Sequence, residues 1–269
     1  MKKTLDIRWL YIVLFLSIIV PMARPIGLPL KMGTWTKIVW DTLDKLGPND
    51  VILIAPDFNA AIEGELGPQR DALIYHLGKK GVKAVFVCFV PQGTQQAKKF
   101  IAGLEAAGRK YGTDLVDLGF VAGEETALAA FFADVKKTCP KDARGTPVAD
   151  IPLMKNINTI RNVKLIIHFA QSTPGTAEYV RQLGTYGTPF IEAVSTGAMA
   201  TTVTYVQSKQ VVGLIAGVQG AAEYEMLNQH LSYATTAMDS QSLAYTVFIG
   251  TIIAGNVIYY LERKRARTN

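Results

Sequence analysis

An uncharged, mostly apolar run near the C-terminus, residues 243–261, constrains this chain more than any other feature. It reads LAYTVFIGTIIAGNVIYYL, which is about the length that a helix needs to cross the hydrocarbon core of a bilayer. Asp239 lies before the run, and the basic sequence ERKRAR follows it. We therefore predict a transmembrane helix, and the rest of the chain is expected to be held at a membrane, with the lipid bilayer as a partner.

Small residues recur on one face of this predicted helix. Thr246, Gly250 and Ala254 are spaced four residues apart, so another helix could approach them closely. Asn256 carries an amide at membrane depth, where an unpaired polar group is costly, so it is expected to face protein rather than lipid. The pattern predicts self-association or packing against another membrane protein, although glycine and alanine are also simply common in membrane helices.

The N-terminus predicts a second membrane segment. A basic start, MKKTLDIR, precedes the apolar residues 9–23, a pattern that signal peptides and uncleaved anchors share. Small residues are poorly placed for cleavage, which favours an anchor. Because residues 9–23 are short for a full crossing, we expect PIGLPL at 25–30 to complete the span, with Arg24 reaching to the interface.

Positive charge is concentrated at the two ends of the chain. Residues 1–31 hold five basic residues against one acidic, and residues 241–269 hold four against one. Since the formal charge of the whole chain is +6, residues 32–240 carry −1, which excludes a basic nucleic-acid-binding domain. The positive-inside rule puts both termini in the cytoplasm and the middle domain outside the plasma (inner) membrane. The basic residues behind this orientation are Lys2, Lys3, Arg8 and those at 263–267.

Residues 32–240 alternate between short apolar runs and amphipathic helical patterns. The runs are too short for helices and are bounded by turn residues, which suits strands buried on both faces. They lie at 51–55, 82–90, 114–121, 163–170, 189–195 and 211–217. Helical patterns lie at 34–46, 66–80, 94–110, 124–137, 175–186, 198–208 and 218–230.

This alternation predicts an α/β fold with a doubly wound, mainly parallel, six-stranded Rossmann-like sheet. A long loop after the third unit separates two halves, which favours the strand order 3-2-1-4-5-6 and leaves another order open. The chain is expected to consist of an N-terminal membrane anchor at 1–31, an extracytoplasmic α/β domain at 32–240, and a transmembrane helix with a basic cytoplasmic tail at 241–269.

Ligands of doubly wound sheets bind at the carboxyl ends of the strands, where the strand order reverses. The loops expected there are polar and contain glycine. The candidate ligand-binding residues are Asp57, Asn59, Gln171, Ser172, Thr173, Ser195 and Thr196. Capping or turn chemistry competes with ligand contact here, because Asp, Ser and Thr are also good residues at the starts of helices.

A catalytic set can be proposed from Ser172 or Ser195 as nucleophile, His168 as base and Asp57 as its partner. No G-x-S-x-G motif supports it, and His168 lies inside a strand pattern, which is more typical of a core histidine. The G-x-G-x-x-G and Walker fingerprints of nucleotide sites are absent, and no spacing indicates a metal. No cofactor is therefore predicted.

The two cysteines, Cys88 and Cys139, do not have the spacing of a metal site. Cys88 lies inside an apolar run, where a buried thiol behaves as a small hydrophobic side chain. Cys139 lies in the loop-like sequence TCPKD. A disulfide between them is left open.

The most distinctive sequence motif in the chain is GAAEYE at 220–225. It is followed by MDSQS at 238–242 and by Gly255 and Asn256 inside the apolar run. This last quarter of the chain resembles an uncharacterised prokaryotic family of two-pass membrane proteins, and the N-terminal PIGLP agrees with it. The resemblance implies no activity. Glu223, Glu225 and Asp239 could order the domain against the membrane or bind a neighbour, and the alternative is a solvated helix face.

Together these patterns favour a non-catalytic, membrane-anchored scaffold or a subunit of an oligomeric membrane assembly. The alternative is a membrane-tethered enzyme or small-ligand-binding protein that uses the crevice at the carboxyl ends of the strands.

Overall fold

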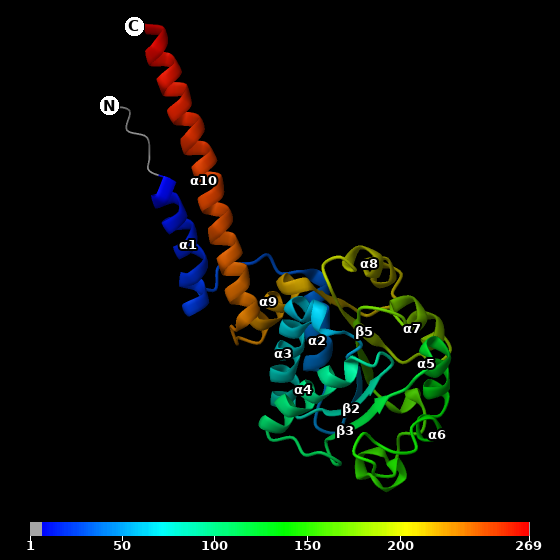
Figure 1. The fold of residues 1–269 in the computed structure, drawn as a ribbon. Helices are drawn as coiled ribbons and strands as arrows, with labels where there is room; N and C mark the ends of the chain where they lie inside the picture. Colours follow the sequence, from blue (N-terminus) through cyan, green and yellow to red (C-terminus); the bar gives the residue numbers. More distant parts are fainter. Residues whose placement is uncertain (1–6, 269) are drawn as a thin grey trace.

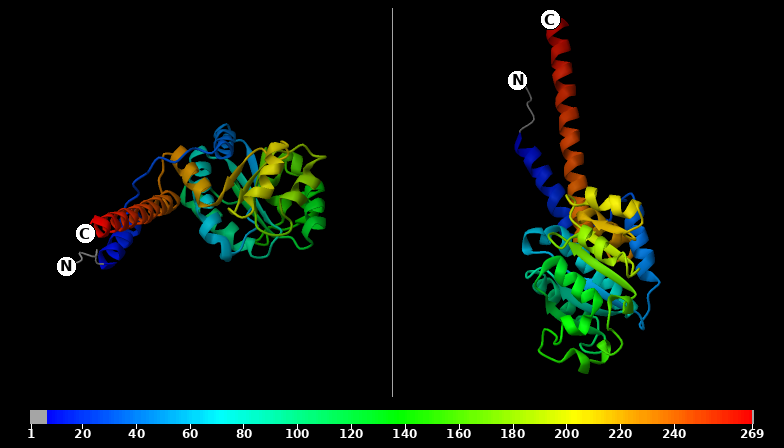
Figure 2. Two further views of the ribbon diagram at one scale, coloured as in Figure 1. Left: turned by 90° about the horizontal axis from the view of Figure 1, so that it is seen from above. Right: turned by 90° about the vertical axis from the view of Figure 1, so that its right-hand side faces the viewer.

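The computed structural model describes residues 7–268 and comprises a layered α/β body and two helices that leave it on one side (Figure 1). These helices are α1, Ile7–Ala23, and α10, Tyr233–Thr268. Two further views also show them side by side, projecting from the body (Figure 2). Lys2 and Lys3, which contribute to the predicted orientation, lie outside the described residues.

The body is built on a parallel six-stranded sheet in the order β3-β2-β1-β4-β5-β6, which confirms the predicted order. The strands are β1 Val51–Ala55, β2 Lys83–Cys88, β3 Leu115–Phe120, β4 Leu165–Ala170, β5 Phe190–Val194 and β6 Leu214–Ala216. Each lies within the apolar run predicted for it. The chain reverses direction of travel across the sheet between β1 and β4, so the switch point lies at the carboxyl ends of these two strands.

Helices cover both faces of the sheet. One face carries α2 Thr34–Asp44, α3 Glu63–Lys80, α4 Gly93–Ala106 and α9 Gly217–Leu227. The other carries α5 Glu124–Ala133, α6 Val135–Thr138, α7 Thr176–Leu183 and α8 Met199–Gln207. The short 3-10 helices are η1 Ala60–Ile62 before α3, and η2 Val148–Asp150, η3 Pro152–Met154 and η4 Ile160–Asn162 between α6 and β4.

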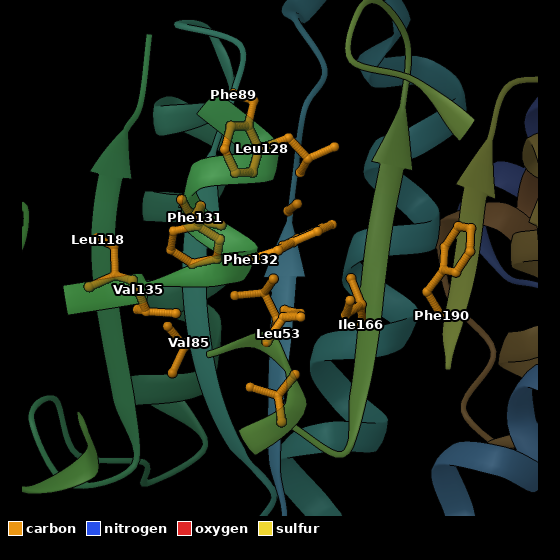
Figure 3. Close-up of a cluster of buried hydrophobic side chains, with 14 of the residues drawn as sticks. Leu53, Val85, Phe89, Leu118, Leu128, Phe131, Phe132, Val135, Ile166 and Phe190 are labelled. Carbon is orange, nitrogen blue, oxygen red and sulfur yellow. The ribbon is translucent and has the colours of Figure 1, made fainter. Parts of the chain in front are cut away.

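Successive strand residues face opposite layers of the core. In β1, Leu53 belongs to the layer beneath α5, whereas Ile52 and Ile54 belong to the layer beneath α3 and α4. Figure 3 shows the first layer, where Phe131 and Phe132 of α5 lie over the sheet. Because both faces are buried, the strands need continuous apolar runs, and this is why the sequence located them well.

One predicted helix, at 124–137, is in fact two. The backbone of Asp134 is extended, with φ −153° and ψ 98°, and it separates α5 from α6. Its carboxylate accepts a hydrogen bond from the backbone N–H of Lys137 at 3.0 Å, so it caps the second helix. The prediction was wrong here because an aspartate can bond to the backbone and so end one helix and begin another.

Among the described helices, α10 alone is long and apolar enough to cross a membrane. α1 has 17 residues, about 25 Å of helix, against a hydrocarbon core of about 30 Å. PIGLPL, which we expected to complete this span, does not continue the helix: α1 ends at Ala23, and the backbone N–H groups of Ile26, Gly27 and Leu28 donate to the carboxylate of Asp239.

The two cysteines are free and buried. Cys88 in β2 belongs to the core layer beneath α3 and α4, whereas Cys139 belongs to the layer on the other face of the sheet. The sheet therefore lies between them, and the disulfide that the sequence left open does not form.

Candidate functional site

The loops after β1 and β4 meet at the switch point, as predicted. The backbone N–H of Asn59 donates to Oε1 of Gln171 at 2.6 Å, which joins the two loops. Ser172 and Thr173 are exposed in the second of these loops. The structure therefore brings Asn59 and Gln171 together as predicted. The hydrogen bond between them uses Oε1 of Gln171, which a ligand would otherwise contact.

Asp57 points away from the solvent. Its side chain is 0% exposed, and Oδ1 accepts hydrogen bonds from the backbone N–H groups of Phe89 at 2.7 Å and Val90 at 3.1 Å. These bonds tie the end of β1 to the loop after β2. The carboxylate is thus used to hold neighbouring strand ends together, in line with the capping or turn role that the sequence offered as the alternative.

A charged cluster lies beneath the switch point, made of Asp57, His168 and Glu192. Nδ1 of His168 lies 3.1 Å from Oε1 of Glu192, and Nε2 lies 3.7 Å from Oδ2 of Asp57. The Tyr179 ring of α7 stacks on the imidazole, with centroids 3.9 Å apart. Strand register explains the grouping, because Ala55 pairs with His168 and His168 pairs with Glu192.

Burial and mutual attraction set the protonation of this cluster. Burial raises the pKa of Asp57 to about 6, against the opposing effect of His168 and the two amides. Burial alone would lower the pKa of His168, but Glu192 and Asp57 raise it more, so the net shift is upward. The arrangement stabilises an imidazolium between two carboxyl groups.

The cluster is closed to a substrate in this structure. His168 is 0% exposed, and its ring nitrogens face Asp57 and Glu192 rather than Ser172 or Ser195. The interpretation of His168 as a core histidine is therefore supported, whereas the proposed nucleophile and base are not in contact. Glu192 was missed by the sequence reading; the available signal was a glutamate inside an otherwise apolar strand, PFIEAV.

Ser195 and Thr196 follow β5 and take part in local bonding. Oγ of Ser195 accepts from the backbone N–H of Ala198 at 3.3 Å, in the turn that leads into α8. The N–H and hydroxyl of Thr196 donate to Oε2 of Glu65 at 2.7 and 2.8 Å. Glu65, which the sequence reading also missed, thus connects the start of α3 to the loop after β5.

A cavity of about 400 Å³ adjoins Thr196 at the carboxyl ends of β5 and β6, beside the base of α10. It is therefore displaced by one or two strands from the switch point. Its walls come from α2, α3, α8, β6, α9 and α10. The residues that line it include Trp35, Glu65, Thr196, Met199, Gln219, Glu223, Met238 and Gln241.

The acidic residues of GAAEYE and MDSQS form the joint between the body and its two helices. Glu225 accepts hydrogen bonds from the N–H groups of Ser232, Ala234 and Thr235 and from the Thr235 hydroxyl, at 2.6 to 3.0 Å, so it caps the start of α10. Asp239 binds the three N–H groups after α1. Both carboxylates are buried, and the solvated-face alternative is wrong.

Two further bonds complete this joint, which we define as residues 24–33, α9 and residues 231–242. The hydroxyl of Ser240 donates to the backbone oxygen of Ile18 at 3.0 Å and thereby connects α10 to α1. The hydroxyl of Tyr224 lies 2.7 Å from Nδ1 of His76, which connects α9 to α3. Burial, the largest effect, lowers the pKa of His76 although Asp44 opposes it, so the bond joins neutral groups.

The predicted helix-packing residues on α10 lie on a different face from α1. The residues of α10 that are half-buried along the apolar run include Leu243, Ala244, Val247 and Thr251, whereas Thr246, Gly250, Ala254 and Asn256 are exposed. No atom lies within 4 Å of the position that a Cβ on Gly250 would take. A partner for this face would have to come from outside the described chain.

Within residues 7–268, no group of three or more His, Cys, Asp or Glu side chains is arranged to hold a metal ion. No family model, curated protein or solved structure matches the chain. The functional interpretation therefore rests on the geometry of the joint, the buried cluster and the cavity.

Proposed function

We propose that the protein is a non-catalytic, membrane-anchored scaffold or subunit that holds an extracytoplasmic Rossmann-like domain in a set orientation to the bilayer. The observation that carries this proposal is the joint. Glu225 and Asp239 bind backbone N–H groups on both sides of the domain boundary, so the body and the helix pair are connected by buried, charge-assisted hydrogen bonds. A tethered enzyme needs only a flexible linker, whereas a structural subunit needs its orientation defined.

The packing of α1 against α10 supports the proposal that α1 also crosses the membrane and that both termini lie on the same side of it. α1 runs antiparallel to α10 and lies against it, and both helices lead away from the body in the same direction (Figure 1). Apart from Arg8 in its first turn, the exposed residues of α1 are apolar, which suits contact with lipid. With the basic residues at 263–267 in the cytoplasm, the domain would lie on the outer side of the plasma membrane.

The alternative of a tethered enzyme or ligand-binding protein at the switch point is less well supported. Asp57 is bound by backbone amides, His168 is enclosed, and Asn59 is joined to Gln171. Ser172 and Thr173 alone remain exposed among the residues predicted around β4. Two exposed hydroxyl side chains without an activating base do not make a catalytic site.

A native mass measurement in mild detergent tests the subunit proposal. We expect a mass that is a multiple of the protomer, and we expect Gly250→Leu to shift it toward the monomer because the added side chain fills the small-residue face. Gly255→Leu is the matched control, because Gly255 is also unobstructed and lies about 140° around the helix from Gly250. A wild-type monomer, or equal effects of both variants, would contradict self-association.

Orientation is tested separately, by adding protease outside intact cells. We expect cleavage within residues 32–240, with the helix pair protected. Full protection of the domain in intact cells, followed by cleavage after lysis, would place the domain in the cytoplasm and overturn the proposed topology.

A further inference from the structure

The cavity at the joint is lined by two acidic side chains and, among the described residues, by no basic one. Of the residues that line it, Glu65 and Glu223 are the charged ones, and both are acidic. Among the residues that the structure describes, neither carboxylate forms an ion pair with a lysine, arginine or histidine. Burial of a carboxylate is costly unless a cation or hydrogen-bond donors compensate it, so the cavity favours a cationic occupant.

Glu223 is the more enclosed of the two acids. Glu223 is 4% exposed, and its Oε1 accepts a hydrogen bond from the side-chain amide of Gln219 at 3.0 Å. A Cβ added to Gly33 would lie 2.6 Å from its Oε2, so a glycine at this position leaves room for the carboxylate. Glu223 is therefore a buried acidic side chain whose described hydrogen-bond partner is one neutral amide.

Glu65 enters the cavity from the start of α3. Its Oε2 accepts two hydrogen bonds from Thr196, which hold the carboxylate in place at the end of β5. Glu65 is half-buried. The two acids belong to separate elements, α3 and α9, so a cation between these elements would also stabilise their contact.

The remaining walls suit an organic cation rather than a bare metal ion. Trp35, Met199 and Met238 contribute apolar and aromatic surface, and Trp is the side chain whose ring face binds ammonium groups best. A metal ion would call for three or more ligating groups, and no such group of acids, histidines or cysteines occurs among residues 7–268. A volume of about 400 Å³ lies in the range of small-molecule sites.

We propose that this cavity binds an organic ammonium group, with Glu223 and Glu65 as counter-ions and Trp35 as an aromatic wall. The group could belong to a free amine or to the ethanolamine or choline headgroup of a lipid. Met238 and Gln241 of α10 line the cavity just before the apolar run, which makes a lipid source accessible. The proposal does not depend on self-association, because Glu65, Glu223 and Trp35 lie outside the small-residue face of α10, although the cavity shares α9 and residues 238–241 with the joint.

The test uses the full-length protein in nanodiscs of phosphatidylglycerol, which has no ammonium group. Ethanolamine and choline are titrated by calorimetry, and a second preparation from a mixture of phosphatidylethanolamine and phosphatidylglycerol is analysed for retained lipid by native mass spectrometry. We expect saturable binding of at least one soluble amine if the source is free, or selective retention of phosphatidylethanolamine if the source is lipid. In either arm, we expect Glu223→Gln to reduce the affinity or the retention at least tenfold.

Two controls keep the result interpretable. Glu105→Gln removes an exposed acid on α4, outside the cavity, and we expect it to bind like the wild type. Trp35→Leu keeps both acidic side chains and removes the aromatic face, and we expect it to reduce the affinity or the lipid retention several-fold. This variant replaces Glu223→Gln in the test if Glu223→Gln does not fold. No binding and no lipid selectivity in the wild type, or equal binding by wild type and folded Glu223→Gln, would overturn the proposal.

Discussion

Two sets of buried acids in this protein are compensated in different ways. At the joint, Glu225 accepts hydrogen bonds at both oxygens from three backbone N–H groups and a hydroxyl, and Asp239 accepts three from the backbone. Beneath the switch point, Asp57 uses one oxygen for two N–H groups, while its Oδ2 and Oε2 of Glu192 lack hydrogen bonds among the described residues.

The difference shows that the hydrogen-bond partners of a buried acid determine whether it mainly fixes the position of a segment or mainly makes stability depend on pH. Oriented N–H groups satisfy a carboxylate without another charge, so the joint acids determine where two segments meet. The acids beneath the switch point depend on His168 for compensation, so their energy depends on how many protons the cluster holds. The first set should therefore respond mainly to mutation, and the second mainly to pH.

The largest expected effect comes from Glu225→Ala. The substitution leaves four donors at the start of α10 without their acceptor, and we expect the free energy of unfolding to fall by about 3 to 5 kcal/mol. Urea unfolding in detergent, followed by circular dichroism, measures it. Glu105→Ala, at an exposed ion pair, should change the value by less than about 1 kcal/mol. Equal effects of the two variants would remove the distinction between joint and surface acids.

The next effect is a pH dependence that belongs to the buried cluster. The pKa of Asp57 is about 6 in the folded protein against an ordinary 3.8, so the folded state binds more protons between these values. Its contribution to stability therefore decreases as pH rises from about 4 to about 6, by about 3 kcal/mol. The raised pKa of His168 has the same sign: its stabilising charge is fully present below 6.5 and is lost as pH rises through the higher folded value.

Asp57→Asn isolates this contribution. The asparagine oxygen can still accept from Phe89 and Val90, so the fold is expected to persist while the titration is removed. Urea unfolding at a series of pH values should show that the variant loses less stability than the wild type between pH 4 and 6. Parallel pH profiles for the two proteins would show that Asp57 does not titrate in this range.

Asp239→Asn sharpens the comparison at the joint with a smaller change. An asparagine keeps one acceptor oxygen but turns an NH₂ group toward backbone N–H donors. We therefore expect the free energy of unfolding to fall by about 2 kcal/mol. Residues 24–33 should also become more susceptible to limited proteolysis, because their attachment to α10 is weakened. Asp41→Asn, in an exposed pair with Lys37, is the matched control. Unchanged protease sensitivity would contradict the assigned role.

The smallest expected effect is that of Tyr224→Phe, which removes a neutral hydrogen bond to His76 and keeps the ring. We expect the free energy of unfolding to fall by about 1 kcal/mol, since the imidazole nitrogen of His76 is left buried without this partner. Tyr75→Phe is the control, because the Tyr75 ring stacks on His230 through its face. A loss as large as that of Glu225→Ala would show that neutral bonds, rather than the acids, dominate the joint.

Patterns of hydrophobic residues determined much of this fold from the sequence alone. The continuous apolar runs located all six strands, and the long loop after the third unit favoured the observed strand order. The uncharged run at 243–261 likewise lies within α10, the helix that is long and apolar enough to cross a membrane among those that the structure describes. These features follow from local composition and chain period, which do not require knowledge of distant contacts.

Tertiary structure decided the roles of the polar residues. The sequence placed Asp57, His168 and Asn59 near one edge of the sheet, but it could not show that Asp57 turns inward or that Glu192 stands beside His168, because strand register sets that pairing. The sequence also could not connect Asp239 to the backbone of residues 26–28, more than two hundred positions away. A buried acid is defined by what it touches, and only the folded chain brings those partners together.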